Sequence, residues 1–248
     1  MRRWLALQRS ARDIVRFVAL TYALAVPFYV VGAVSDWQIV PGLPIAALMF
    51  VGPTMAALLL VGTGARRALL ARALDDVRPR AWLAPVLLLM PAILAISYAW
   101  QRAHDHAPAL VAVAPWLPPV LFGAFFVAAL GEEIGWTGYA TERSRANVGA
   151  GLFLGVACAG IHVIPFAQAH RDVEWIVWQC LFTIAFRVIL VMLFSRAGRS
   201  VLAVSLCHAA YNTAWLLLPV GGSSYDPRSV FAITAVVAVA LGFARPQQ

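Results

Sequence analysis

The sequence predicts an all-α protein, a polytopic bundle of transmembrane helices that forms a single integral-membrane domain over residues 1–248. Of the 248 residues, 62% are hydrophobic and only 12% are charged, whereas soluble domains are about 45–50% apolar and about 25% charged. The mean hydropathy of +0.81 agrees with this composition. The apolar residues also gather into runs of around 20 residues, the length that a helix needs to cross about 30 Å of hydrocarbon. The chain is therefore predicted to be a membrane protein.

About eight such runs follow one another along the chain. The connections between them, of which 63–81 and 101–116 are the longest, are too short to fold as domains. The residues whose side chains could carry out chemistry lie in a motif-bearing core at roughly 117–218. The predicted spans are 17–34, 43–62, 82–100, 117–139, 148–166, 175–194, 201–218 and 230–243.

The positive charge is unevenly distributed between the connections. All 19 basic residues are arginines, against 11 acids, and they alternate with apolar spans, which favours a topological signal over nucleic-acid binding. The positive-inside rule puts the arginine-rich connections and both termini in the cytoplasm of a cell (inner, or cytoplasmic) membrane, where the arginines also contact anionic membrane lipid. One side holds Arg2, Arg3, Arg9, Arg12, Arg16, Arg66, Arg67, Arg72, Arg78, Arg80, Arg143, Arg145, Arg196, Arg199 and Arg245, and the other holds Arg102, Arg171 and Arg228.

A few polar and ionisable residues lie within the predicted spans. Such residues are rare at membrane depth and usually face a bundle interior or a cavity. Each has a structural explanation when taken alone: an acid near a span end snorkels to the interface, a histidine or asparagine bonds a neighbouring helix, and an arginine pairs with a buried acid. Taken together they favour a functional site. They are Glu132 and Glu133 in the fourth span, His162 in the fifth, Arg187 in the sixth, and His208 and Asn212 in the seventh.

Depth and helical phase indicate which of these side chains meet. At about 1.5 Å per residue, Glu132 lies roughly 10–12 Å, His208 roughly 12 Å and His162 roughly 21 Å from the arginine-rich ends of their helices. His208 and Asn212 are four residues apart and share a face. Glu132 and Glu133 differ by about 100° around the helix, so one can serve a cavity while the other braces the bundle from the face of Thr137.

These residues fall into motifs that resemble the CAAX protease and bacteriocin-processing family of intramembrane proteases, also called CPBP or Abi proteins. The family carries EExxxR on one helix, FxxxH on the next, and HxxxN or HxxxD two helices later. This chain has "EEIGWTG", "CAGIHVIP" and "HAAYN" in that order, and "FVGPTMAALLL" in the second span is similar to the family's GP-containing segment. The resemblance covers most of the chain.

Two positions depart from the family pattern. The family's arginine is Thr137 here and its phenylalanine is Cys158. The phenylalanine is expected to pack, so cysteine is tolerable there. The arginine is expected to pair with Glu133, and we hypothesise that Arg187 supplies this charge from another helix. Without such compensation, Thr137 indicates a degenerate relative.

The resemblance implies an intramembrane endopeptidase of metallo- or glutamic type, similar to CAAX prenyl protease 2. It implies that Glu132 is the general base, that His162 holds the attacking water, and that His208 and Asn212 donate to the oxyanion in a cavity open to the cytoplasmic side. Glu132, His162 and His208 also suit one divalent metal, zinc. The expected substrate is a peptide or a membrane protein.

The residues leave two other classes of function open. Glu132, Glu133 and the histidines suit a proton or ion relay in a transporter, and a catalytically degenerate relative would be a membrane scaffold or immunity protein. Other protease chemistries fit poorly, because the chain has neither a GxGD nor a GxSG motif.

Overall fold

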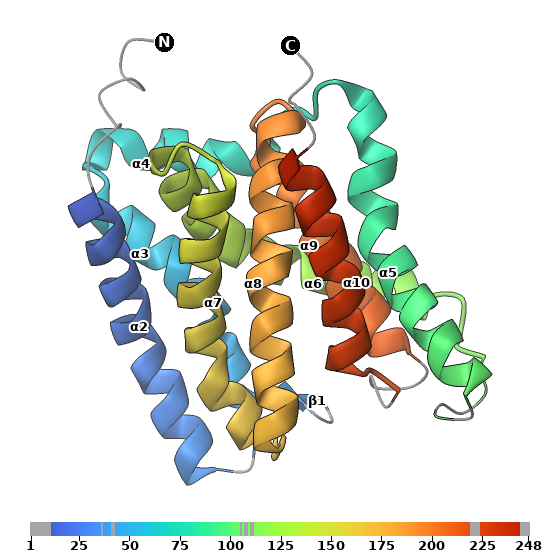
Figure 1. The fold of residues 1–248 in the computed structure, drawn as a ribbon. Helices are drawn as coiled ribbons and strands as arrows, with labels where there is room; N and C mark the ends of the chain where they lie inside the picture. The colour runs from blue at the N-terminus through green and yellow to red at the C-terminus, as the bar shows by residue number, and fades with distance from the viewer. Residues whose placement is uncertain are drawn as a thin grey trace.

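The structure is a computed structural model that describes residues 11–35, 37–40, 43–104, 106, 109, 112–218 and 224–243. These residues form a bundle of helices, which confirms the predicted all-α class (Figure 1). The elements, in order, are α2 (Ala11–Val34), β1 (Gln38–Val40), β2 (Leu43–Pro44), the 3-10 helix η1 (Ile45–Val51), α3 (Gly52–Leu60), α4 (Thr63–Leu70), the 3-10 helices η2 (Ala71–Leu74) and η3 (Arg80–Trp82), α5 (Leu83–Ala103), α6 (Leu117–Gly135), the π-helix η4 (Trp136–Thr141), α7 (Val148–Gln168), α8 (Val173–Arg196), α9 (Val201–Leu217) and α10 (Pro227–Phe243).

Each predicted span coincides with a helix or with two joined helices. Among the residues that the structure describes, five helical segments are long and apolar enough to cross a membrane, and Ile45–Leu60, Val201–Leu217 and Pro227–Phe243 are shorter apolar helices. Seventeen residues extend about 25 Å, somewhat less than the roughly 30 Å hydrocarbon core. The chain is thus a multi-pass helical protein, and the count of eight spans and the cytoplasmic termini stay predictions.

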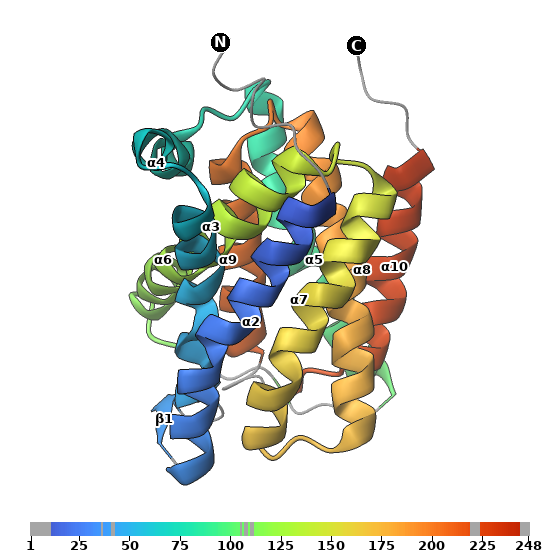
Figure 2. The same cartoon turned by 90° about the vertical axis from the view of Figure 1, so that its left-hand side faces the viewer.

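Two features were not predicted. The connection 63–81 contains α4 and two 3-10 turns, and α4 lies across the end of the bundle at which α8 ends and α9 begins (Figure 1). An antiparallel hairpin of β1 and β2 precedes η1 and lies at the opposite end of the bundle (Figure 2). Both elements are too short to show a clear hydrophobic period in the sequence.

The helices that carry the motifs begin at side-chain caps. Asn147, Asp172 and Ser200 precede α7, α8 and α9, and their side chains accept hydrogen bonds from the backbone N–H groups of Ala150, Trp175 and Ala203. Such a cap satisfies one of the free donors of a helix N-terminus and sets the residue at which the helix starts. The caps therefore fix the register that brings the motif residues to one level.

Close helix contacts hold the site-bearing helices together. Helix α8 lies between α7 and α10, while α6 packs on α9 (Figure 1). Glycines allow this close approach: a Cβ built on Gly155 would lie 2.9 Å from Ile184 Cα of α8, and one on Gly135 would lie 2.3 Å from the Pro53 carbonyl. Gly135 thereby joins α6 to the GP-containing segment at the start of α3.

The helix of the two glutamates changes character directly after them. Helix α6 ends at Gly135 and continues as a π-helix over Trp136–Thr141, whose side chains are all buried. Wide π turns inside α-helices occur frequently at functional sites. Here the wide turn carries Thr137, which faces back toward Glu133.

Candidate active site

A cavity of about 350 Å³ lies between α6, α7, α8, α9 and η1. Its volume is within the range of ligand sites, which is about 300–1,000 Å³. Most of its lining is apolar and aromatic. Among the lining residues are Glu132, His162, Arg187, His208 and Asn212. The structure therefore brings together, around one cavity, every predicted site residue except Glu133.

Glu133 lies behind the cavity wall and is fully buried at 0% exposure. Its Oε2 accepts hydrogen bonds from Thr137 Oγ1 at 2.6 Å and from Arg187 Nη1 at 2.7 Å. Its Oε1 lies 2.9 Å from His208 Nδ1. A carboxylate paired with arginine only accepts hydrogen bonds, so His208 donates from Nδ1. Three donors from α8, α9 and the π-helix thus satisfy this buried charge.

The charge that the family places at position 137 comes from α8 in this chain. Arg187 is only 2% exposed, and its second guanidinium nitrogen, Nη2, lies 3.5 Å from Cys158 Sγ. The guanidinium also lies over the Trp136 ring at 5.8 Å. Thr137 and Arg187 share one carboxylate oxygen. The arrangement is the one that the compensation hypothesis requires, and the effect of losing Arg187 stays a prediction.

Glu132 points in a different direction from its neighbour, as helical phase predicted. Its side chain lines the cavity and is 9% exposed. Within the described part of the chain, no donor forms a hydrogen bond with its carboxylate, whereas Glu133 has three. Glu132 is therefore the glutamate whose oxygens are available to a water or substrate in the cavity.

The hydrogen bond of His162 defines which of its nitrogens is available. Its Nδ1 lies 2.7 Å from the carbonyl oxygen of Cys158, one turn earlier on α7. A carbonyl only accepts, so Nδ1 carries a proton, and Nε2 keeps an accepting lone pair whenever the ring is neutral. His162 can therefore accept a hydrogen bond from a water in the cavity, and Asn212, on the same helix face as His208, offers amide donors.

The zinc set expected from the resemblance is not assembled. Among the residues that the structure describes, no three side chains of His, Cys, Asp or Glu lie close enough together to hold a metal ion. A catalytic zinc site needs about three protein ligands converging on one point. Glu132, His162 and His208 share the cavity, but they do not converge in this way.

A second polar cluster escaped the sequence analysis. Gln179 of α8 accepts a hydrogen bond from Tyr225 at 2.6 Å through Oε1 and donates to Tyr211 at 3.2 Å through Nε2. Burial raises the pKa of the Tyr225 phenol well above its usual value. Gln179 and Tyr211 line the cavity beside Trp175 and Phe182. A glutamine inside an apolar span was the available signal, since polar groups at that depth usually have a partner.

The cavity extends toward one end of the bundle. Beyond Glu132 and His208 its lining continues to Ile39 and Leu43 of the hairpin, Arg171 of the α7–α8 connection, and Trp215 in the last turn of α9. This is the end at which β1 lies, opposite to α4 (Figure 2). The remaining histidines, His104, His106 and His170, are not among its lining residues.

Comparison with known proteins supports the assignment of the motifs. Residues 114–214, which include all three motifs, match the model of a family described as Rce1-like, type II CAAX prenyl endopeptidase. A search of curated proteins found no match. Through the segment that builds the cavity, this multi-pass membrane protein is similar to the Rce1-like type II CAAX prenyl endopeptidase family, in agreement with the resemblance that its motifs carry.

Proposed function

We propose that the chain is an intramembrane endopeptidase of the CPBP type, similar to CAAX prenyl protease 2, that uses Glu132 to activate a water. Its place of action is the cell's inner membrane, and its substrate is a peptide or a membrane protein. One observation carries the proposal. Of two adjacent glutamates, Glu133 is saturated by three donors, while Glu132 faces the cavity without a hydrogen-bond donor from the described residues.

The reaction consumes one water and breaks one peptide bond. Glu132 removes a proton from the water, whose oxygen bonds to the carbonyl carbon and forms a tetrahedral oxyanion. The C–N bond then breaks, and the proton held by Glu132 passes to the leaving nitrogen, which gives a carboxylic acid and an amine. With a neutral ring, His162 holds the attacking water through Nε2, because its Nδ1 is occupied by the Cys158 carbonyl.

The oxyanion needs donors from the opposite side. Asn212 supplies amide N–H groups at all protonation states of its neighbours. His208 donates a hydrogen bond from Nδ1 to Glu133, so its Nε2 can also donate only when the ring is doubly protonated. Asn212 is therefore the constant donor, and removing one oxyanion donor typically lowers kcat about 10²–10³-fold.

Thr137 does not make the site degenerate in this proposal. The family arginine is expected to pair with the second glutamate, and here Arg187 lies 2.7 Å from Glu133. Glu133 in turn orients His208. This observation favours the protease over a scaffold that has kept only the fold.

The reaction is assigned to Glu132 without a metal, because the donors around the cavity form no three-ligand set among the described residues. We expect that a zinc chelator leaves cleavage unchanged. Cleavage that is lost with chelator and restored by added zinc would instead assign the metallo-type mechanism.

The substitution Glu132→Gln tests the proposal, and Glu174→Gln is its matched control. Glu174 lies in the first turn of α8, is 62% exposed and pairs with Arg228 outside the cavity. We expect Glu132→Gln to assemble normally and abolish cleavage, and Glu174→Gln to cleave as the unmodified chain does. Retained biological activity with Glu132→Gln supports the scaffold. A proton or ion flux in liposomes that depends on Glu132 supports the transporter.

A further inference from the structure

Arginines are concentrated at one end of the bundle. The described arginines at the α4 end are Arg12, Arg16, Arg66, Arg67, Arg72, Arg78, Arg80, Arg143, Arg145, Arg196 and Arg199, while only Arg102, Arg171 and Arg228 lie at the hairpin end. Part of the α4 end is tied together by ion pairs, in which Glu142 contacts Arg199 at 2.9 Å and Arg72 at 3.4 Å. By the positive-inside rule, the α4 end is the cytoplasmic end.

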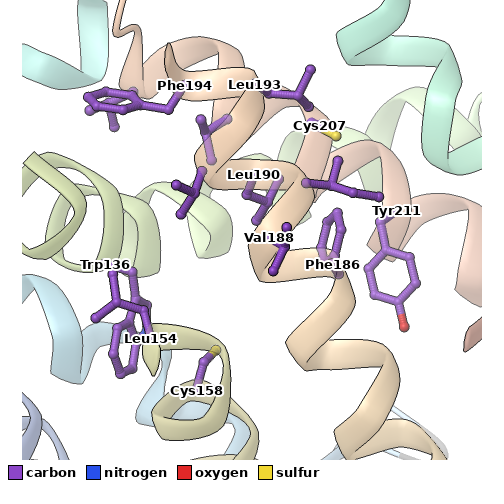
Figure 3. Packing of buried hydrophobic residues seen from close by; sticks show 14 of the residues in the cluster. Trp136, Leu154, Cys158, Phe186, Val188, Leu190, Leu193, Phe194, Cys207 and Tyr211 are labelled. Atoms are coloured by element: carbon purple, nitrogen blue, oxygen red, sulfur yellow. The ribbon is translucent and has the colours of Figure 1, made fainter. Parts of the chain in front are cut away.

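The α4 end of the bundle is closed beneath this charged layer. Trp136, Leu190 and Phe194 have no exposed surface, and Leu193 is only 1% exposed. On α8, Leu190, Leu193 and Phe194 lie beyond Phe186 toward the α4 end (Figure 3), and Trp136 belongs to the same buried cluster. Close packing of this kind leaves no path for water or a peptide. Access to Glu132 from the cytoplasm is therefore blocked by the packed core.

The hairpin end of the bundle, in contrast, contains the mouth of the cavity. Ile39 and Arg171 at this end line the cavity, and Ile39 is 44% exposed. Val127 of α6 also lines the cavity and is 64% exposed, so the cavity has a side that faces lipid. The sequence predicted that both the cavity mouth and the arginine-rich end of the bundle face the cytoplasm. In this fold they lie at opposite ends of the bundle, so the two predictions are not compatible.

We propose that the active-site cavity opens away from the cytoplasm and that the enzyme cleaves an extended apolar segment presented at the non-cytoplasmic surface of its membrane. The geometry also bounds the position of the cleaved bond. His162 lies seven residues before Ala169 and His208 nine residues before the end of α9, which places the site roughly 10–14 Å below the rim. An extended chain covers about 3.3 Å per residue, so the bond lies about three to four residues inside the cavity.

The lining agrees with an apolar segment. Aromatic side chains cover the path from the rim to the glutamate, among them Trp175, Trp215 and Phe186. Arg171 stands at the rim with its guanidinium 4.8 Å from the centre of the Trp175 ring. Cleavage of this segment rests on the proposed function, whereas the side on which the cavity opens does not.

Cysteine labelling with a membrane-impermeant maleimide tests the side directly. Ala169→Cys places a thiol at the rim of the cavity, and Ala68→Cys places one on the exposed face of α4. Both are made in a chain that lacks its own cysteines, Cys158, Cys180 and Cys207. Where this chain fails to fold, the two thiols are introduced into the natural chain and scored above its background.

We expect right-side-out vesicles to label Ala169→Cys, and only inverted vesicles to label Ala68→Cys. Labelling of Ala169→Cys only in inverted vesicles, or of both thiols from one side, overturns the inference. The readout needs no proteolysis. Outer labelling together with unchanged cleavage by Glu132→Gln would reject the proposed function and keep the sidedness.

Discussion

The buried ion pair between Arg187 and Glu133 provides the sharpest test of how this chain replaces the family's arginine. The two charged groups are 2% and 0% exposed and lie 2.7 Å apart. Removal of one partner of such a pair leaves an uncompensated buried charge, which costs about 3–5 kcal/mol. We therefore expect Arg187→Ala to lose about this much stability.

Thermal unfolding in detergent measures this loss. Cys158 and Cys207 are 2% and 0% exposed, so a thiol-reactive dye reports unfolding when they become accessible. For a chain of this size, 1 kcal/mol corresponds to about 2–4 °C in Tm, which gives an expected decrease of about 6–20 °C. The variant Arg187→Met combined with Glu133→Gln removes both charges and should be more stable than Arg187→Ala.

The compensation hypothesis makes a further demand on the same assay. Thr137 already contacts the oxygen of Glu133 that Arg187 contacts. Thr137→Arg should therefore restore part of the stability lost in Arg187→Ala, because it returns the positive charge to the family position. An Arg187→Ala protein with an unchanged Tm, or a double variant no more stable than the single one, would refute the reasoning.

Three smaller predictions concern packing and hydrogen bonding. Gly135→Ala places a Cβ 2.3 Å from the Pro53 backbone and should cost about 1–3 kcal/mol in the thermal assay, whereas Gly123→Ala, with no atom within 4 Å, should not destabilise. Thr137→Val removes the hydrogen bond to the charged Glu133 and should lower the free energy of unfolding by about 1.5–3 kcal/mol. A stability equal to that of the natural chain would contradict a stabilising role of this hydrogen bond. Burial raises the pKa of Tyr225, so the neutral phenol stabilises the fold below its unfolded pKa of about 10 and this contribution is lost as the pH rises further. The stability difference between the natural chain and Tyr225→Phe should therefore narrow above pH 10, and a difference constant in pH would count against it.

The sequence predicted the helices well because the apolar runs are long and the lipid-spanning pattern leaves little choice of secondary structure. It also predicted the grouping of Glu132, His162, His208 and Asn212, since depth and helical phase follow from residue spacing alone. The separation of roles between the adjacent glutamates came from the same 100° rotation.

Other features depend on contacts between distant helices and were outside the reach of spacing arguments. The direction in which the cavity extends is set by where large side chains such as Trp136 and Phe194 fill the bundle, and every span is rich in such residues. The link from Gln179 to Tyr225 joins α8 to a short connection before α10. Convergence on a metal requires ångström accuracy, which helix depths estimated to one turn do not provide.

The most direct test of the central claim, that Glu132 is the catalytic carboxylate, is the mapping of new protein N-termini in membranes that contain either the natural chain or Glu132→Gln. Glu174→Gln serves as the control in the same experiment. The account predicts that at least one membrane protein accumulates uncut with Glu132→Gln and that its new N-terminus disappears, while the control matches the natural chain. Identical N-termini in all three membranes, with Glu132→Gln folded and present at normal levels, would contradict it.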